Sequence, residues 1–400
     1  MSVCLSTVDL SLENVPDRDE IAAVRDLVRS FVAAELAPHE EAVDAGGEIP
    51  AGLRAQVVGR ALDAGLYAFN LPAEVGGPGL SFLAQTVVRR ELAHSSFALA
   101  DLIVRPPRTL LHCDAGQRAR WLGPAVRGEV RFAFALTEPE AGSDPGSMRT
   151  RAVWTPEGYR LDGVKHFISH GGTAELVIVY ARTVRDGREE GITALVVERG
   201  QAGFRCTRED RTMGWIGSPL SELAFDDCLV PHGNVVGTPG EGLRLALAQI
   251  NEARLGVAAH CAGIAEHALD LALAHARTRT QFGRPIGANQ GLQWRLADMA
   301  ARVEQARTVV TNVALAVDRA GLDDRDNSRY RIPLAKLTAS ELAGSVVDDA
   351  LQLFGGSGFV RGTTVERMYR DVRAFRLGEG TSEMQRNRIG RALVGRLETP

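Results

Sequence analysis

An acidic residue between two glycines is the first feature of this sequence that could do chemistry. The segment RLGEGTSEMQ (376–385) places Glu379 between Gly378 and Gly380. Glycine is unfavourable inside a helix or a strand, so the segment predicts a turn. A solvated acid in a turn is the default interpretation of this pattern. The alternative is that the backbone must come close to a ligand on which Glu379 acts.

The turn LTEPEAGSD (136–144) follows a predicted strand and could also bind a ligand. Its backbone N–H groups and the hydroxyls of Thr137 and Ser143 are suitable donors to a polar ring or a phosphate. On the pattern alone, the segment is only a loop.

Two further segments end predicted helices. RTRTQFGRPIGANQ (277–290) clusters arginines that by default offset a helix dipole, but that could also clamp a pyrophosphate. LQLFGGSGF (351–359) is by default a helix C-cap, and the alternative is close backbone approach to a ligand. It lacks the preceding strand of a dinucleotide fingerprint.

Nothing in the sequence predicts a metal site or a nucleophilic serine. His260 and His267 lie seven residues apart without an acidic or cysteine partner at ligand spacing, so packing or surface roles are expected. The Gly-x-Ser-x-Gly and phosphate-loop motifs are absent from the sequence. The five cysteines are scattered, which is typical of reduced thiols in a cytoplasmic protein.

Composition excludes several classes of partner. The chain has 400 residues, 45% of them hydrophobic, which allows two or three structural units. A formal net charge of −4 argues against nucleic-acid binding. No apolar run is long enough to span a membrane, and the acidic N-terminus does not resemble a signal peptide. We therefore expect a cytoplasmic protein that binds neither nucleic acid nor membrane.

Three regions of the chain, which differ in residue composition and hydrophobic periodicity, must position these segments. Residues 1–130 are predicted as an N-terminal helical domain and residues 131–235 as a β-domain, because short Val- and Ile-rich runs there are separated by Gly, Pro and Asp. Residues 236–400 are predicted as a C-terminal four-helix bundle. The strands do not alternate with helices, so an α+β fold with an antiparallel β-barrel or sandwich is expected. Within RLGEGTSEMQ (376–385), Thr381 or Ser382 could be the N-cap of a short C-terminal helix.

Taken together, five segments resemble the acyl-CoA dehydrogenase family of flavoproteins. They are ALTEPEAGSD, LDGVKHFISHG, MGWIGSPLSELAFDDCLVP, ARTRTQFGRPIGANQ and LQLFGGSGFVRGTTVERMYRDVRAFRLGEGTSEMQ, in this order. The likeness runs from residue 18 to 395. It implies a helical domain, a β-domain and a helical bundle, assembled into a homotetramer or homodimer.

The resemblance also implies an FAD site. Leu136 and Thr137 would approach the isoalloxazine ring, and Phe167 would cover its other side, where many relatives have Trp. The segments 279–290 and 352–356 would reach the FAD of a neighbouring subunit. The implied FAD-binding residues are Phe134, Leu136, Thr137, Ser143, Phe167, Ile168, Ser169, Arg279, Gln281, Phe282, Asn289, Gln290, Gln352, Gly355, Gly356, Thr381 and Glu383.

Glu379 matches the position of the catalytic base in most of the family. The alternative base position of some relatives is occupied here by Ala253, which cannot act as a base. The resemblance implies that Glu379 takes the α-proton of an acyl thioester while a hydride leaves the β-carbon for FAD. Hydrogen bonds to the thioester carbonyl would stabilise the enolate, and the product would be a trans-2-enoyl thioester. The implied substrate-binding residues are Ser143, Asn251, Arg254 and Gly380.

Three positions bear on the acyl group. Gly378 stands where most relatives have an aromatic residue, often Tyr, which predicts room for a branched, cyclic or bulky group. Ala100 matches a position that helps set the depth of the acyl pocket in the family, which predicts room for a longer or larger group. Arg105 could bind a substrate carboxylate, although we favour a solvent-facing side chain.

Several alternatives remain open. The thioester carrier could be CoA or an acyl carrier protein, and the expected electron acceptor is an electron-transfer flavoprotein. A flavin-dependent oxygenase or oxidase on the same scaffold is the second hypothesis, and a non-catalytic flavin-binding protein is the third. The presence of Glu379 favours the dehydrogenase.

Overall fold

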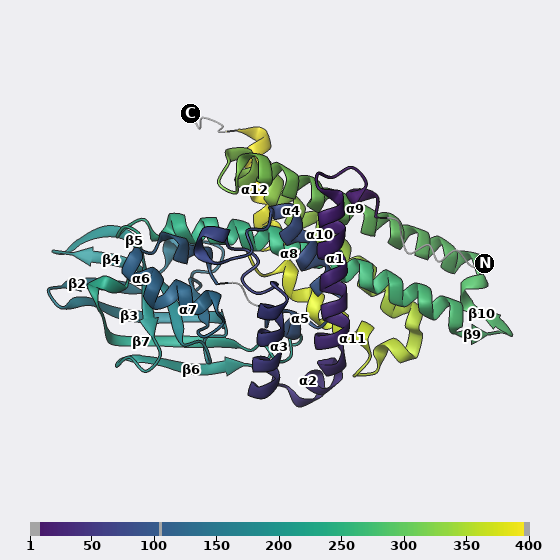
Figure 1. The fold of residues 1–400 in the computed structure, drawn as a ribbon, viewed down its shortest axis with the longest axis horizontal. Coiled ribbons are helices and arrows are strands. Elements are labelled where there is room, and N and C mark those ends of the chain that lie inside the picture. Colours follow the sequence, from purple (N-terminus) through teal and green to yellow (C-terminus); the bar gives the residue numbers. More distant parts are fainter. Residues whose placement is uncertain (1–8, 104–105, 396–400) are drawn as a thin grey trace. The chain divides into compact units, whose positions relative to one another are not determined.

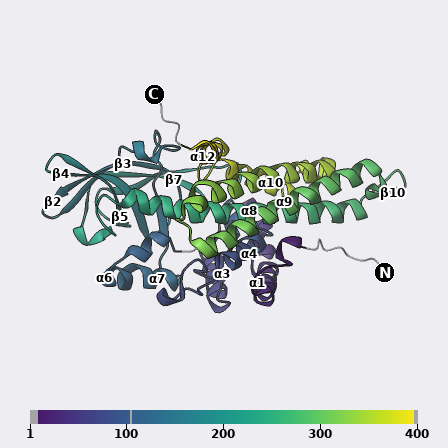
Figure 2. The same cartoon turned by 90° about the horizontal axis from the view of Figure 1, so that it is seen from above.

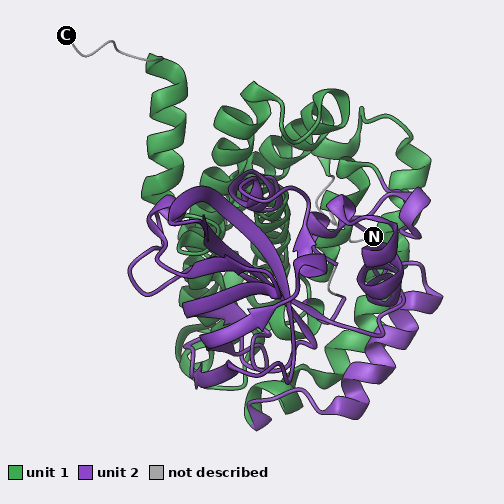
Figure 3. Ribbon diagram, turned by 90° about the vertical axis from the view of Figure 1, so that its left-hand side faces the viewer, with its two compact units in different colours: residues 1–45, 81–100, 251–400 green, residues 46–80, 101–250 purple. Residues whose placement is uncertain are grey.

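The structure, a computed structural model, describes residues 9–103 and 106–395. The chain divides into two compact units, which are coloured green and purple in Figure 3. Unit 1 comprises Met1–Ala45, Ser81–Ala100 and Asn251–Pro400, and unit 2 comprises Gly46–Leu80 and Asp101–Ile250. The units group the chain differently from the three predicted domains, whose boundaries stay a prediction.

Unit 1 is helical. Its long helices are α8, α9 and α10, which lie side by side in Figures 1 and 2. Arg307 of α9 forms an ion pair with Glu266 of α8 (2.5 Å), and α10 contacts α9, α11 and α12. The helices of this unit are α1 (Arg18–Phe31), α2 (Glu40–Gly46), α4 (Phe82–Leu92), α5 (Phe97–Ala100), α8 (Gly242–Thr278), α9 (Gln290–Ala320), α10 (Ile332–Phe354), α11 (Thr364–Val372) and α12 (Ser382–Val394), of which α2 ends and α8 begins in unit 2.

Small residues allow the helices of unit 1 to pack closely. Helix α8 buries a series of alanines, among them Ala258, Ala262 and Ala265. A Cβ atom added at Gly263 of α8 would lie 2.0 Å from the carbonyl oxygen of Arg90 in α4. Only glycine therefore fits where these two helices meet, and the alanine-rich texture of α8 follows from the same requirement.

Unit 2 is built around one sheet. Its strands follow the order β6-β7-β3-β2-β4-β5-β8, and β1 pairs with β4 off this path. The strands are β1 (Phe132–Ala135), β2 (Arg151–Thr155), β3 (Gly158–Ser169), β4 (Leu176–Arg185), β5 (Arg188–Glu198), β6 (Phe204–Asp210), β7 (Leu220–Val230) and β8 (Val235–Val236). Its short helices are α3 (Ala51–Asp63), α6 (Ala115–Gln117) and α7 (Gly123–Val126).

The predicted α+β class is confirmed: along the chain, helical regions precede and follow the region that forms the sheet. The sheet itself is mixed rather than wholly antiparallel, because β4 pairs in parallel with both β1 and β2. Strand β4 is long enough for the two short strands to lie along it in succession. The strands of the described residues form no closed barrel. None of the helices in the described part of the chain combines the length and the apolar character of a membrane-spanning segment.

Candidate active site

Glu379 lies in a turn between a 3-10 helix (Arg373–Arg376) and α12, within unit 1. Its φ of 56° and the φ of 87° at Gly380 are both in the left-handed region. Such a conformation is unusual for a residue with a side chain and marks a position that the surroundings must stabilise. The turn ends at Thr381, whose Oγ1 accepts the backbone N–H of Met384 (3.3 Å). The predicted cap of α12 is therefore confirmed at Thr381.

Three buried side chains hold the two carbonyl groups of this turn. Arg254 Nε donates to the carbonyl oxygen of Glu379 (2.9 Å). Lys336 Nζ donates to the carbonyl oxygen of Gly380 (2.8 Å). Gln385 Nε2 donates to both oxygens, at 3.2 Å and 2.9 Å. We call Arg254, Lys336 and Gln385 the turn clamp. It fixes the backbone on both sides of the Glu379 carbonyl.

Two of the predicted substrate-binding residues lie beside this turn. Arg254 Nη1 donates to Asn251 Oδ1 (2.9 Å), and both residues are buried in α8. Burial lowers the pKa of Arg254 to about 10, with a further lowering by Arg388 and an opposing contribution from Glu379. The guanidinium still carries its charge at neutral pH. Binding of the substrate by Asn251 and Arg254 stays a prediction, but the structure gives Arg254 a role in holding Glu379.

In unit 2, the turn after β1 is held by a second buried lysine. Lys165 Nζ donates to the carbonyl oxygen of Leu136 (3.0 Å) and to Glu138 Oε1 (2.8 Å). The carboxylate of Glu138 also accepts the backbone N–H groups of Arg149 (2.6 Å) and Thr150 (3.0 Å). The predicted ligand-binding loop thus has a fixed conformation.

The charges of this pair influence each other. Burial lowers the pKa of Lys165 to about 8, although Glu138 opposes the shift. Burial acts against the carboxylate of Glu138 as well, but Lys165 and the backbone donors hold its pKa below the usual value. The pair is therefore ionised at neutral pH.

The end of β3 lies next to this loop. The backbone N–H of His166 donates to the carbonyl oxygen of Thr137 (2.9 Å). Phe167, the next residue, has a φ of 57° and is 56% exposed. Its ring stacks on the ring of His166 (centroids 3.9 Å apart), whose Nε2 lies 2.9 Å from Asp210 Oδ2. The structure therefore brings Thr137 and Phe167 to one end of the sheet.

The neighbouring candidates in unit 2 differ in exposure. Ile168 is buried, Ser169 is half-buried and Ser143 is exposed in its loop. The half-buried ring of Phe134 packs against Tyr180 (5.0 Å between centroids). Phe134 therefore has a packing partner inside its own unit.

A second group of candidates lies at one end of the helices of unit 1. The strands β9 (Thr280–Gln281) and β10 (Arg284–Pro285) form a short hairpin after α8. The ring of His275 near the end of α8 stacks on Phe354 at the end of α10 (4.2 Å between centroids), which brings the hairpin and the glycine segment together. The candidates here are exposed, except for the half-buried Asn289: Arg279, Gln281, Phe282, Asn289, Gln290, Gln352, Gly355 and Gly356.

Among these residues, the exposure of Phe282 is unusual, because large apolar side chains are mostly buried. Phe282 is 100% exposed and has a φ of 53°. A Cβ atom at Gly356 would meet no atom of the described chain within 4 Å, so packing within the chain does not require glycine there. Asn289 has local partners, since its Oδ1 accepts from Arg284 Nη2 (2.9 Å) and its Nδ2 donates to Ile286 O (3.0 Å). This end of the unit therefore presents an unpartnered aromatic ring and open backbone.

The sequence motifs missed four residues that shape these segments: Glu138 as a loop anchor, Lys165, Lys336 and Gln385. Their roles depend on contacts between distant parts of the chain, which no local spacing reveals. One signal could have identified two of them. Lys165 and Lys336 are the only lysines in the sequence, beside 44 arginines.

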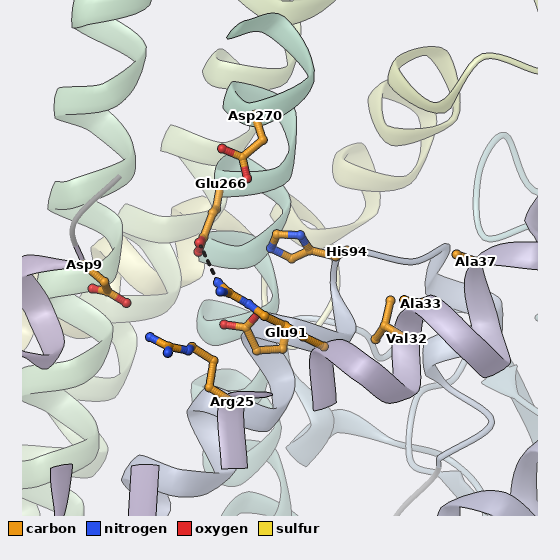
Figure 4. Close-up of a pocket in the computed structure, with 10 residues that line it drawn as sticks. Asp9, Arg25, Val32, Ala33, Ala37, Glu91, His94, Glu266 and Asp270 are labelled. Atoms are coloured by element: carbon orange, nitrogen blue, oxygen red, sulfur yellow. Dashed lines mark hydrogen bonds and ion pairs between the residues drawn. The ribbon is translucent and has the colours of Figure 1, made fainter. Parts of the chain in front are cut away.

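A cavity of about 620 Å³ lies elsewhere in unit 1 (Figure 4). It contains none of the predicted site residues. Three of its charged groups form ion pairs: Arg29 Nε donates to Glu91 Oε2 (2.7 Å), and Arg29 Nη2 lies 3.6 Å from Glu266 Oε1. These ion pairs join α1, α4 and α8, so they are typical of a structural contact between helices.

The two histidines considered above pack inside unit 1. The rings of His267 and His94 lie 4.9 Å apart, and burial lowers the pKa of His267 to about 3, with a contribution from His94. His260 packs against Phe97 and Phe375. Among the described residues, no group of three or more His, Cys, Asp or Glu side chains is arranged to hold a metal ion.

Comparisons with known proteins identify the chain. The acyl-CoA dehydrogenase N-terminal, middle and C-terminal domain families match residues 18–129, 133–228 and 240–394. An acyl-CoA dehydrogenase of Bacillus subtilis is 37% identical over 94% of this chain and 98% of its own length. An acryloyl-CoA reductase (NADH) of Anaerotignum propionicum is 35% identical over 93% and 94%.

A solved structure shares the same fold. Butyryl-CoA dehydrogenase from Megasphaera elsdenii superimposes with a TM-score of 0.86 and 31% identity, covering 96% of this chain and 99% of that one. The matches extend over all three regions that carry the candidate residues. The chain belongs to the acyl-CoA dehydrogenase family, whose members are flavoprotein oxidoreductases that act on acyl-CoA.

Proposed function

We propose that this protein catalyses FAD-dependent α,β-dehydrogenation of an acyl thioester, with Glu379 as the base. The observation that carries the proposal is the left-handed turn at Glu379, held by the turn clamp, whose donors come from α8, α10 and α12. A carboxylate on a backbone that is both strained and fixed indicates a position kept for chemistry.

The described residues fit a flavin by the chemistry of their groups. An isoalloxazine ring needs apolar contact on its faces and hydrogen-bond donors at its polar edge. Phe167 offers an exposed aromatic face, and Thr137 and Ser169 offer hydroxyl groups at the same end of the sheet. Leu136, Phe134, Ile168 and Ser143 complete the proposed set in unit 2. When bound, FAD supplies the acceptor for a hydride from the β-carbon of the substrate.

The residues of this chain perform the remaining steps. The backbone N–H of Glu379 donates to the thioester carbonyl oxygen, which favours the enolate form of the substrate. The carboxylate of Glu379 takes the α-proton, and the β-hydrogen leaves with its electron pair. The product is the trans-2-enoyl thioester. Asn251, Arg254, Ser143 and Gly380 are proposed to position the thioester arm.

We further propose that a second subunit completes the FAD site. The support is the exposed group at the end of unit 1, because the fully exposed Phe282 and the open backbone at Gly356 suit contact with another molecule. Arg279, Gln281, Asn289, Gln290, Gln352 and Gly355 would take part, and Thr381 and Glu383 would hold the nucleotide half. A homotetramer or homodimer follows, and sedimentation of the flavin-bound protein tests it.

The acyl group is proposed to be branched, cyclic or otherwise bulky. A Cβ atom at Gly378 would meet only the carbonyl oxygen of Ala374, at 3.7 Å. The fold therefore accepts a side chain at this position, and its absence leaves space directly before the base. Ala100 is buried in α5 and also small. Arg105 lies outside the described residues.

The carrier is proposed to be CoA or acyl carrier protein, with an electron-transfer flavoprotein as the electron acceptor in the cytoplasm. The test is an anaerobic titration of the flavin-bound protein with straight, branched, cyclic and dicarboxylic acyl-CoA esters, followed by visible absorption. Bleaching by one class of ester, and none in Glu379→Gln with its flavin retained, supports the proposal.

Other outcomes would redirect the assignment. Bound flavin that no CoA ester bleaches would contradict CoA as the carrier, and acyl carrier protein esters would be tested next. Rapid reoxidation of the reduced enzyme by air would favour the oxygenase or oxidase. Oxidation of the reduced enzyme by 2-enoyl-CoA, without bleaching by saturated esters, would favour the reductive direction named for the Anaerotignum propionicum relative.

A further inference from the structure

The use of lysine in this chain is highly selective. The sequence contains 44 arginines and two lysines, Lys165 and Lys336. Both lysines are 0% exposed, and each donates Nζ to a backbone carbonyl, of Leu136 and Gly380 respectively. Both carbonyls belong to segments that we propose to bind flavin or substrate. Arginine occupies every other cationic position, so these two sites require something that arginine does not supply.

The requirement follows from the shape of the two cations. An ammonium is a compact point charge with three rotatable donors, whereas a guanidinium is a planar fork that suits carboxylates. Arg307 and Arg90 are also buried in unit 1, and both are paired with carboxylates. The buried Arg254 donates to the Glu379 carbonyl, but its guanidinium also uses a second nitrogen, Nη1, on Asn251 Oδ1. A single backbone carbonyl in a closed interior suits the smaller ammonium.

Lys336 is the more unusual of the two lysines. Lys165 has Glu138 as an ion-pair partner, but within residues 9–103 and 106–395 no carboxylate forms an ion pair with Lys336. Burying a charge without an opposite charge in direct contact is unfavourable. A lysine at such a position contributes more to the local geometry than to the stability of the fold.

We infer that Lys336 is a positioning residue, whose ammonium holds the Gly380 carbonyl and thereby keeps Glu379 directed at the α-carbon of the substrate. The inference rests on the proposed dehydrogenase function and adds a residue to it. Loss of the ammonium would let the turn relax from its left-handed conformation. The carboxylate of Glu379 would remain present but would no longer be correctly aimed.

The electrostatic surroundings of Lys336 give the inference a pH signature. Burial lowers the pKa of Lys336 to about 8; Cys261 of α8, Glu379 of the turn and Glu341 of α10 raise it, and Arg254 of α8 lowers it further. The ammonium is therefore present below about pH 8 and is lost above it. Flavin reduction by substrate should slow as the pH rises through this range.

The test compares Lys336→Met with the wild-type protein and with Arg319→Met. Methionine keeps the length of the side chain and removes the donor and the charge, while Arg319 is exposed near the end of α9 and controls for loss of a cation. The first readout is hydrogen exchange of residues 377–385 in the flavin-bound protein. Faster exchange is expected in Lys336→Met and not in Arg319→Met.

The second readout is anaerobic flavin reduction by a saturating acyl-CoA ester. We expect a rate lower by about 10- to 100-fold in Lys336→Met, the scale of a misplaced catalytic group, with flavin content and binding of the enoyl-CoA product unchanged. The wild-type rate should fall above about pH 8, and this alkaline decline should be missing in Lys336→Met.

Each outcome separates the inference from the proposed function. A Lys336→Met protein with wild-type exchange and wild-type rates would overturn the role of Lys336 alone. An alkaline decline that persists in Lys336→Met would come from another group and would also overturn the inference. If Lys336→Met does not fold, a wild-type rate that stays constant from pH 7 to pH 9.5 refutes the inference. If no thioester bleaches the wild-type flavin, the proposed function fails first and the inference with it.

Discussion

The structure predicts opposite effects for two glycine-to-alanine substitutions ten residues apart, one beside the turn clamp and one in α12. At Gly380, alanine would adopt a φ of 87°, and its Cβ atom would lie 2.9 Å from Nε2 of Gln385. A left-handed conformation costs a non-glycine residue about 1–2 kcal/mol. Gln385 would have to move, with loss of its hydrogen bonds to the two carbonyls, each contributing about 1 kcal/mol. Gly380→Ala should therefore destabilise the protein by about 3 kcal/mol.

Gly390 in α12 is the matched control. A Cβ atom there would meet nothing within 4 Å, and the residue lies in a helix. Alanine is preferred over glycine in a helix, so Gly390→Ala should stabilise the protein by about 0.5–1 kcal/mol. Urea unfolding of the flavin-free variants, followed by circular dichroism, measures both changes. Flavin reduction by substrate should be lost in Gly380→Ala and retained in Gly390→Ala. Equal stability of the two variants would refute the described geometry of the turn clamp.

Two further predictions concern the neighbouring segments. Gly378→Tyr should leave the free energy of unfolding within about 0.5 kcal/mol of wild type, because open space surrounds the position. The substitution should reduce activity on branched or cyclic acyl-CoA esters more than on straight ones. Equal losses for all esters would contradict the proposed role of Gly378 in selectivity. Lys165→Met should destabilise the protein by about 3 kcal/mol at pH 7, because Glu138 is left as a buried, unpaired charge. This loss of stability should become smaller as the pH falls, because Glu138 becomes protonated in the variant. Urea unfolding of both proteins at pH 7 and pH 5 measures the change. A loss of stability that is independent of pH would argue against the ion pair.

The sequence was informative where a local rule or a family motif applied. The glycines around Glu379 predicted a turn, and the structure places Glu379 and Gly380 in left-handed conformations there. Thr381 was one of two predicted caps of α12 and is the observed one. The change from helical to strand texture after residue 130 gave the fold class.

The sequence could not reveal features that depend on distant contacts. Alternation of residue types shows which face of a strand is buried but not the direction of its partner, so the parallel pairing of β4 with β1 and β2 was missed. The contact between Lys336 and Gly380 joins residues 44 positions apart. Nothing in the spacing around either residue indicates that α10 contacts the turn.

The burial of both lysines also affects the chemical reactivity of the protein towards acyl thioesters. Acyl thioesters are electrophiles that acylate accessible amines, and an amine is more reactive when it is neutral. The only side-chain amines of this chain are 0% exposed, and the many surface cations are guanidinium groups, which stay protonated. The folded surface therefore offers no lysine for self-acylation at high thioester concentrations. For the same reason, labelling of a lysine of this protein by an amine-directed reagent indicates local or global unfolding.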